Sequence, residues 1–398
     1  MVSLHDWQQR ALDYANTKNK ALIQCATGTG KTYFATQWVL RLLKQYPETR
    51  ILIIVPKIVI LEQVWLRELS RAGIPPNKIG MYYMEAREYS TITLTTNASV
   101  TKINTELFDH VIIDEIHNFN TTRLEPVLKK DWKTLIGLSA TIMSSNHEHW
   151  KLLARFGFDT FEYDAGHAMK DEIISTMDFI NVPVEFKDET LRERYEELTK
   201  EVRRLSLLRN LAGATNTTGI RMALYAANNE RNQIVYEYED KLKTTVEIIK
   251  RHPRDKIIVF NQRNAVSTKL WWMLTELGVK AVVVNSRVPK QQRASNLASF
   301  AKGEARVLLA SISLDEGANV PDANVAIILS GSNALRQVVQ RAGRVLRKTG
   351  QKHHAILYQV FLKDTTEEKH ARQRAKYFKS ISLTNVIIPS RSFLSNKP

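Results

Sequence analysis

Short, almost wholly apolar runs alternate along this chain with amphipathic stretches of helical period, and this alternation most constrains how it can fold. In the first 160 residues or so, the runs that predict strands are 21–24, 51–55, 92–94, 111–113 and 134–138, and the predicted helices are 33–44 and 58–72. Strands that are apolar throughout are buried on both faces, as in a parallel sheet whose crossover helices cover both sides. The pattern therefore predicts an α/β fold built on a parallel sheet.

The same alternation returns near residue 253, after a stretch of different character. Between about 187 and 252, apolar residues recur every three or four positions, which predicts helix. From 253 onward the predicted strands are 256–260, 280–284, 306–310, 325–329 and 355–361, the last closing the sheet, and the predicted helices are 268–277, 291–300 and 367–379. We expect a first domain over 1–165, a helical connector over 166–252, a second domain over 253–365, and a basic helix with a polar tail over 366–398.

The charge balance favours a polyanionic partner. The chain has 57 Lys and Arg against 41 Asp and Glu, a formal net charge of +16. Cationic side chains that contact phosphates release counterions, so such an excess favours nucleic acid. A basic surface without a dedicated partner is the alternative. The arginines of the connector likewise either contact a phosphate backbone or form a solvated face balanced by nearby glutamates.

The cysteine content and the absence of a signal-peptide or membrane-spanning pattern indicate the cellular compartment. Cys25 is the single cysteine, which excludes an intramolecular disulfide and a cysteine-based zinc site and favours a reducing compartment. The N-terminus has no signal-peptide pattern, and the strongest apolar run, 51–61, is too short to span a bilayer. We expect a cytoplasmic protein with no membrane association.

A loop rich in glycine and threonine follows the first predicted strand and directly precedes a helix. It consists of Ala26, Thr27, Gly28, Thr29, Gly30, Lys31 and Thr32. Glycines let successive N–H groups face phosphate oxygens, and the helix N-terminus adds a favourable dipole. Lys31 is placed to reach the β- and γ-phosphates of ATP, and Thr32 to bind Mg²⁺. The general pattern has a glycine where this chain has Cys25, and a turn that happens to be rich in glycine and threonine is the alternative.

Two acidic residues end the very apolar strand at 111–113. Asp114 and Glu115 stand where an α/β sheet presents catalytic groups, at the carboxyl end of a strand. Asp114 can hold Mg²⁺ through water, and Glu115 can polarise the water that attacks the γ-phosphate. Phosphoryl transfer requires mainly positioning and charge stabilisation, which these groups supply.

Together these motifs resemble the superfamily 2 helicases, in particular the DExH branch, over residues 4–361. The resemblance implies two tandem RecA-like domains with ATP hydrolysed between them. In the first domain it implies that Gln8 contacts adenine and that Pro56, Lys57, Thr95 and Thr96 contact the nucleic-acid backbone. It also implies that His117, Ser139, Ala140 and Thr141 couple hydrolysis to nucleic-acid binding.

The second half carries the later motifs of the same family. Residues 314–321 are similar to the fifth motif, where Gly317 is implied in nucleotide binding, although Asn319 stands where most relatives have an acid. Residues 340–347 match the sixth motif, which implies Arg344 and Arg347 as arginine fingers and Gln340 as a contact to the γ-phosphate or water. An arginine supplied from the other domain makes hydrolysis depend on domain closure. Arg287 and Ser311 are implied as nucleic-acid contacts.

The sequence therefore predicts a nucleic-acid-stimulated ATPase that translocates on DNA and unwinds, branch-migrates or reanneals it. The compact size looks most like translocases of the XPB and phage UvsW kind. An RNA helicase and the motor subunit of a restriction system are alternatives, since they share the nucleotide motifs. A non-enzymatic nucleic-acid-binding switch is disfavoured because Lys31, Glu115 and Arg344 are all present. We expect a monomer that is open to protein partners.

Overall fold

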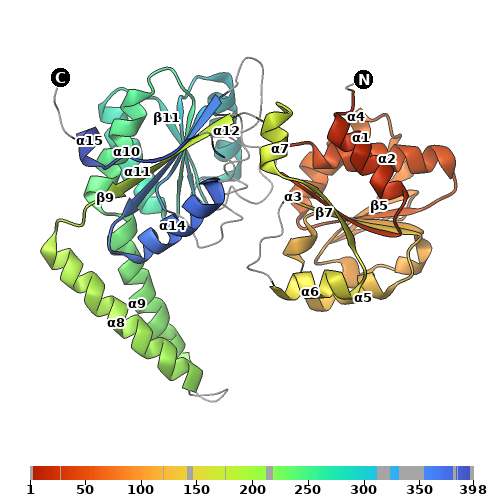
Figure 1. Cartoon of the computed structure of the whole chain (residues 1–398), viewed down its shortest axis with the longest axis horizontal. Coiled ribbons are helices and arrows are strands. Elements are labelled where there is room, and N and C mark those ends of the chain that lie inside the picture. The colour runs from red at the N-terminus through yellow and green to blue at the C-terminus, as the bar shows by residue number, and fades with distance from the viewer. Residues whose placement is uncertain are drawn as a thin grey trace. The chain divides into compact units, whose positions relative to one another are not determined.

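The computed structural model divides the chain into two compact units (Figure 1). The structure describes residues 3–26, 28–119, 121–140, 147–174, 176–211, 218–311, 323–330, 354–379, 382 and 384–394. Residues up to 174 belong to the first unit and the described residues from 176 onward to the second.

The first unit is an eight-stranded sheet in the order β4-β3-β5-β2-β6-β7-β1-β8, flanked by helices. All neighbouring strands are parallel except β3 and β4. The strands are β1 (Lys20–Cys25), β2 (Ile51–Val55), β3 (Ile79–Tyr83), β4 (Ala86–Arg87), β5 (Ile92–Thr96), β6 (His110–Ile113), β7 (Thr134–Ser139) and β8 (Asp159–Tyr163). The α-helices are α1 (Asp6–Asn16), α2 (Lys31–Gln45), α3 (Ile58–Ile60), α4 (Leu66–Arg71), α5 (Thr121–Lys129), α6 (His147–Arg155) and α7 (Ala165–Lys170).

The predicted strands of this unit are its central strands. Every residue of β2 and β6 is buried, as expected for strands covered by helices on both faces. The predicted helix at 58–72 is present over Ile58–Arg71, but a π-helical segment, η1 (Leu61–Trp65), joins α3 to α4. Short 3₁₀ turns fill the connections at η2 (Pro76–Lys78), η3 (Val100–Lys102), η4 (Thr105–Leu107) and η5 (Ile116–Asn118).

The second unit is a seven-stranded parallel sheet in the order β11-β12-β10-β13-β14-β9-β15. Its strands are β9 (Thr176–Val184), β10 (Ile257–Asn261), β11 (Ala281–Val284), β12 (Val307–Ser311), β13 (Val325–Ile328), β14 (His354–Leu362) and β15 (Thr384–Ile387). Its helices are α8 (Glu189–Leu211), α9 (Thr218–Tyr236), α10 (Glu239–Arg251), α11 (Asn264–Glu276), α12 (Lys290–Lys302), α14 (Thr366–Lys379) and α15 (Arg391–Leu394).

The expected domain boundaries differ from this division. The range 166–252 is not purely a helical connector, because it contains β9, which lies between β14 and β15 in the second sheet. It also contains α10, whose Leu242, Val246 and Ile249 belong to the core of the second unit. The segment after 366 is no free tail, since β15 extends the sheet beyond β14. The prediction that the strand at 355–361 closes the sheet is therefore wrong.

Helices α8 and α9 form an antiparallel pair that extends from the second sheet (Figure 1). The pair has a small core of its own, made of Leu198, Leu205, Leu224 and Ala227. Several arginines of α8 form ion pairs at its surface, for example Arg204 with Glu201 at 2.7 Å. These ion pairs agree with the solvated-face alternative, and contact of this face with a phosphate backbone stays a prediction.

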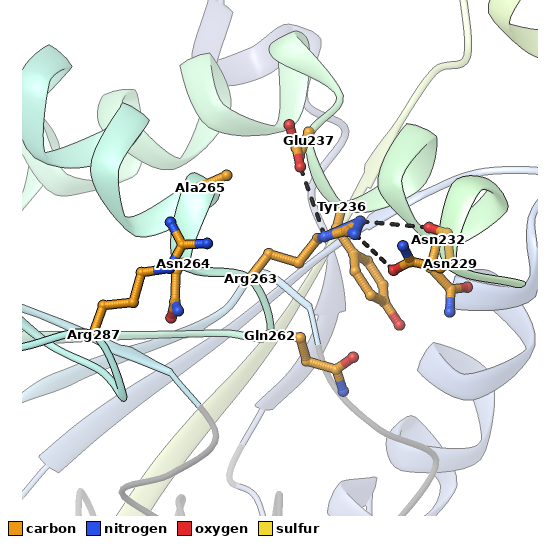
Figure 2. Close-up of a pocket in the computed structure, with 9 residues that line it drawn as sticks. All are labelled: Asn229, Asn232, Tyr236, Glu237, Gln262, Arg263, Asn264, Ala265 and Arg287. Carbon is orange, nitrogen blue, oxygen red and sulfur yellow. Dashed lines mark hydrogen bonds and ion pairs between the residues drawn. The ribbon is translucent and has the colours of Figure 1, made fainter. Parts of the chain in front are cut away.

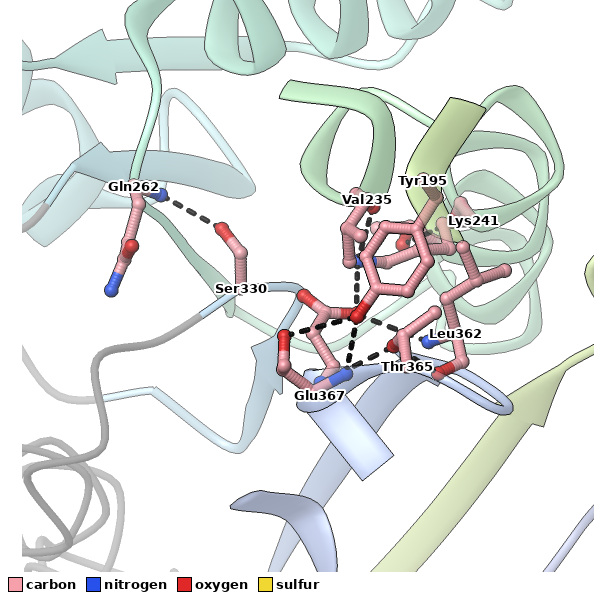
Figure 3. A network of polar contacts seen from close by, with 10 residues as sticks. Tyr195, Val235, Lys241, Gln262, Ser330, Leu362, Thr365 and Glu367 are labelled. Atoms are coloured by element: carbon pink, nitrogen blue, oxygen red, sulfur yellow. Dashed lines mark hydrogen bonds and ion pairs between the residues drawn. The ribbon is translucent and has the colours of Figure 1, made fainter. Parts of the chain in front are cut away.

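The start of this pair is fixed to the sheet by a buried polar network (Figure 3). The fully buried Lys241 ammonium lies 2.7 Å from the Glu367 carboxylate and donates to the Val235 carbonyl at 3.0 Å. The same carboxylate accepts from the Leu362 amide at 3.0 Å. The Tyr195 hydroxyl accepts from the Thr366 amide at 2.8 Å. Helices α8, α9, α10 and α14 are thereby joined to the end of β14.

Candidate active site

The phosphate loop leaves the sheet at the carboxyl end of β1 and ends at Gly30, where α2 begins. Gly30 has φ +93°, a backbone conformation that favours glycine. A Cβ at this position would lie 2.8 Å from the Gln8 amide nitrogen. Gly30 is therefore required both by its backbone conformation and by the close approach of Gln8.

Gln8 supports this loop from α1. Its side chain is buried and its amide donates to the Thr29 carbonyl at 3.4 Å and to the Gly30 carbonyl at 3.3 Å, while its Oε1 accepts from the His5 amide at 3.0 Å. The Thr29 hydroxyl closes the loop by donating to the Ala26 carbonyl at 2.8 Å. The contact of Gln8 with adenine remains a prediction.

Lys31, the first residue of α2, points its ammonium into the loop. Nζ donates to the Cys25 carbonyl at 3.4 Å and lies 3.9 Å from a Glu115 carboxylate oxygen. The predicted loop lysine and the predicted catalytic acid therefore meet in one site. Cys25 is fully enclosed, and burial raises the pKa of its thiol to about 11, which makes it an unreactive packing residue.

Asp114 lies directly after β6 and is held by a residue that the sequence analysis did not single out. The Trp65 indole donates to Asp114 Oδ2 at 2.8 Å. Burial raises the pKa of Asp114 to about 6, and the Glu115 carboxylate acts in the same direction, while the Trp65 hydrogen bond and Lys31 oppose it. A buried carboxylate with this neighbourhood is a group whose charge a nearby cation would stabilise.

Glu115 begins a continuous contact chain that leads to β7. Its backbone is left-handed, with φ 48° and ψ 49°, which is uncommon for a residue with a side chain and typical of functional sites. His117 Nε2 lies 3.2 Å from Glu115 Oε2, and His117 Nδ1 shares a 2.6 Å hydrogen bond with the Ser139 hydroxyl. His117 thus faces the Glu115 carboxylate with one ring nitrogen and the Ser139 hydroxyl with the other. The structure thus joins the predicted catalytic acid to two predicted coupling residues.

The residues around the loop fit a nucleotide-bound Mg²⁺ ion. Mg²⁺ is usually held by one or two carboxylates together with substrate phosphates and waters. Asp114 supplies a buried carboxylate and Thr32, in the first turn of α2, a hydroxyl. Within the described residues, no group of three or more His, Cys, Asp or Glu side chains could hold a metal without such a substrate.

The predicted nucleic-acid contacts of the first unit lie at the same carboxyl edge of the sheet. Pro56 and Lys57 follow β2, and Lys57 precedes α3; partial burial lowers the pKa of its ammonium. The Thr95 hydroxyl is buried and donates to the Tyr82 carbonyl at 2.7 Å, and Thr96 is also buried. Their side chains thus have structural partners, and their contact with nucleic acid stays a prediction.

The carboxyl edge of the second sheet has a pocket of about 440 Å³ (Figure 2). Arg263 follows β10 and donates to the Asn229 side chain at 2.8 Å, with its Nε 3.7 Å from Glu237. The predicted contact Arg287 follows β11 and also lines this pocket, and Ser311 ends β12. The lining comes from the end of α9 and the residue after it, from the start of α11, and from the loops after β10 and β11, namely Asn229, Asn232, Tyr236, Glu237, Gln262, Arg263, Asn264, Ala265 and Arg287.

Several predicted residues lie outside the described residues. These are Thr27, Thr141, Gly317, Gln340, Arg344 and Arg347. Their roles as loop, coupling and arginine-finger residues remain predictions. Ala140 is described and is buried next to Ser139.

Two family models match the chain, and both agree with this architecture. Residues 1–144 match "Type III restriction enzyme, res subunit", and residues 240–349 match "Helicase conserved C-terminal domain". Among solved structures, the Hef helicase domain of Pyrococcus furiosus superposes with a TM-score of 0.63 at 17% identity, over 93% of this chain and 98% of that one. The fold and site define a tandem RecA-like, ATP-hydrolysing motor of the helicase class.

Curated relatives match the chain over nearly its whole length. The chain is 25% identical over 389 residues to the DNA 3'-5' translocase XPB2 of Sulfurisphaera tokodaii, covering 94% of this chain and 84% of the relative. It is 26% identical over 388 residues to the DNA 3'-5' helicase XPB of Mycobacterium tuberculosis, covering 94% of this chain but 63% of the relative. Over nearly its whole length the chain is therefore similar to XPB-like helicases of superfamily 2. In the part of the chain that the structure describes, no helix has the length and apolarity that a bilayer crossing needs.

Proposed function

We propose that this protein is an ATP-dependent DNA translocase that remodels DNA by unwinding, branch migration or reannealing. The observation that carries the proposal is the continuous chain of contacts from Lys31 through Glu115 and His117 to Ser139. A site built only to hold ATP would need the loop and lysine. The further contacts from Glu115 through His117 to Ser139 connect the catalytic acid to a second strand of the sheet, β7. This connection supports a hydrolysis step that responds to another ligand.

Each group has a role in that step. Lys31 neutralises charge on the transferred phosphoryl group, and Glu115 orients and polarises the attacking water. Asp114 and Thr32 would hold Mg²⁺, which would supply positive charge to the phosphates of the bound nucleotide. Arg344 and Arg347 would supply the remaining positive charge from the second unit, with Gln340 beside them. The nucleotide would also contact Gln8, Thr27 and Gly317.

DNA is favoured as the track for two independent reasons. The net charge of +16 suits a polyanion, and two relatives that match nearly the whole chain are named as acting on DNA. We place the nucleic acid along the carboxyl edges of both sheets, with Lys57 and Arg287 as backbone contacts. Such contacts recognise the phosphate backbone and not sequence. We further propose a cytoplasmic monomer.

The test is steady-state ATP hydrolysis by the purified protein alone and with duplex, single-stranded or forked DNA, or with RNA. We expect strong stimulation by DNA and weak stimulation by RNA. Preferential stimulation by RNA would replace the DNA proposal with an RNA helicase. Hydrolysis that no nucleic acid changes would contradict a motor function.

Two variants test the nucleotide site separately from nucleic-acid binding. Lys31→Ala removes the ammonium from the loop, so turnover should fall to background. Glu115→Gln keeps the shape of the side chain but loses its charge, so it should bind ATP while failing to hydrolyse it. Turnover retained by Lys31→Ala would show that the loop is not the hydrolysis site.

A motor subunit of a restriction system is the second candidate, because the first family model is described as a restriction-enzyme subunit. Such a subunit would track duplex DNA without opening forks. Displacement of a triplex-forming strand without fork unwinding would favour this candidate. Fork unwinding would favour a helicase.

A further inference from the structure

We propose that the β3–β4 hairpin is an apolar pin whose tip, Met84, inserts into the base stack of the DNA on which the motor acts. The inference rests on the proposed function and specifies a contact with bases, which the phosphate-binding residues do not provide. The hairpin lies in the first unit, at the side of the sheet opposite β8.

The tip residue, Met84, has a left-handed backbone conformation that is unfavourable for methionine. Tyr83 pairs with Ala86, which leaves a two-residue turn of Met84 and Glu85. Met84 has φ 48°, and turns of this length favour glycine or asparagine at positions with positive φ. The Met84 side chain is 66% exposed, so it makes little use of burial in its own fold. An unfavourable backbone conformation that is kept at an exposed apolar residue points to a function for the side chain.

Two contacts from β3 to the rest of the unit, and one contact across the hairpin, hold it behind this tip. The Tyr83 hydroxyl donates to Glu62 at 2.8 Å and the Tyr82 hydroxyl donates to the Lys102 carbonyl at 3.0 Å. The Arg87 guanidinium lies 4.8 Å from the centre of the Tyr82 ring. A flexible loop would fold its apolar tip onto the surface, whereas this anchored turn presents it.

After β4 the chain passes very close to Gly80 of β3. A Cβ at Gly80 would lie 2.5 Å from the Glu88 carbonyl oxygen, so only glycine lets residues 88–90 pass across β3. The Glu88 amide donates to the Met81 carbonyl at 3.0 Å. The hairpin is therefore anchored at its open end as well as along its length.

The tip lies at the edge of the sheet where nucleic acid is proposed to bind. Strands β3, β5 and β2 are parallel neighbours, so their carboxyl ends face the same edge. With neighbouring strands about 4.8 Å apart, the end of β3 lies roughly 10 Å from the end of β2, where Lys57 stands. A base-paired step spans about 3.4 Å, so Met84 and Lys57 could engage the same few nucleotides.

The chemistry around the tip matches bases better than phosphates. Glu85 is exposed beside Met84 and repels a phosphate backbone, and the neighbouring cation Arg87 lies over the Tyr82 ring. Methionine is among the apolar residues that proteins insert between base steps, partly unstacking them. DNA bases are thus the occupant that the charges and the apolar tip favour, and an apolar protein partner is the competing occupant.

The test uses the full-length protein and forked DNA with a fluorescent adenine analogue at the junction. Met84→Gly and Met84→Asn remove the apolar tip but accept positive φ, so each should keep or raise the melting temperature. Each should lower the number of base pairs unwound per ATP hydrolysed by roughly tenfold, the scale of one lost stacking contact. The junction fluorescence that wild type induces should disappear in both variants.

Controls make the outcome specific. Met84→Leu keeps an apolar tip and should retain most unwinding and the fluorescence change. Leu277→Ala removes a 51% exposed apolar side chain from the second unit and should change neither. If Met84→Gly leaves both the fluorescence change and unwinding as in wild type, the pin proposal is wrong. The exposed tip would then be better explained as a contact for an apolar protein partner. Failure of wild-type protein to respond to any DNA would instead overturn the proposed function.

Discussion

Asp114 shows how a catalytic carboxylate is positioned by a residue far away in the sequence. Its other contacts come from neighbours in its own motif and from the loop lysine, but its one side-chain hydrogen-bond donor among the described contacts is Trp65, at the end of a π-helical segment. π-Helical turns occur frequently at functional sites because they shift one side chain out of the regular helical register. We infer that Trp65 is a positioning residue for Asp114.

Trp65→Phe should lower ATP turnover mainly by weakening the binding of Mg²⁺. The ring volume is largely kept, but Asp114 loses its indole donor and the free energy of unfolding should fall by about 1–3 kcal/mol. Partners of this kind typically contribute 10–100-fold to metal affinity or activity. We therefore expect turnover to require roughly tenfold more Mg²⁺, measured by titrating Mg²⁺ at saturating ATP.

Trp132→Phe is the matched control. The Trp132 indole is also buried in the first unit and donates to the Val127 carbonyl at 2.7 Å, away from the site. It should lose comparable stability without a change in Mg²⁺ requirement. Equal Mg²⁺ curves for the two variants would mean that Trp65 only packs.

Contacts between residues that follow parallel strands of one sheet could be predicted from the sequence, and contacts made by a helix side chain could not. Lys31 and Glu115 were expected in one site because each follows a parallel strand of the same sheet, and they do lie there. The contact of Trp65 with Asp114 was not expected. The sequence pattern of a buried tryptophan in an apolar helix is the same whether its N–H donates to a carboxylate or to a backbone carbonyl. The one-letter pattern does not specify the π-helical register that directs it.

The same limit applies to whole elements. Strands β2, β6, β10 and β12 are buried on both faces and were predicted from their apolar runs. Strand β8 lies at an edge and mixes exposed with buried residues. Strand β15 is short and exposed along its length, and its apolar residues follow the polar Thr384 and Asn385, so neither strand has the pattern of a buried strand. Strand β9 alternates and contains Pro183, which weakened its pattern although it lies inside the sheet.

The attachment of the α8–α9 pair is an element-level feature that depends on one buried ion pair. Lys241 is fully buried, and burial lowers the pKa of its ammonium while Glu367 opposes that shift. Glu367→Gln leaves the buried cation without its counter-charge, so the free energy of unfolding should fall by about 3–5 kcal/mol in urea titrations.

Two further variants test the cause of that loss. Lys241→Met combined with Glu367→Gln removes both charges and should recover most of the stability. Glu201→Gln breaks the exposed pair with Arg204 and should leave the stability nearly unchanged, because solvent screens such pairs. If the double variant is no more stable than Glu367→Gln alone, the loss of stability does not come from the uncompensated charge of Lys241.

At the scale of the whole molecule, the positive charge and the two sheet edges should determine how binding depends on salt. Each phosphate contact releases counterions, so the logarithm of the affinity for duplex DNA falls with the logarithm of salt concentration with a slope near −0.9 per contact. For a track of about five phosphate contacts we expect a slope of about −4 to −5, measured by fluorescence anisotropy without ATP.

Single contacts can then be assigned by their effect on that slope. Lys57→Ala and Arg287→Ala, one at each sheet edge, should each reduce its magnitude by about 1. Lys243→Ala is the control, since Lys243 is exposed but paired with Glu239 at 2.8 Å on α10 and lies in neither proposed contact. If Lys57→Ala alone changes the slope, the track is confined to the first unit and the second unit serves only the nucleotide. If both change it, DNA engages each unit separately, which is what a motor needs to advance one unit while the other holds.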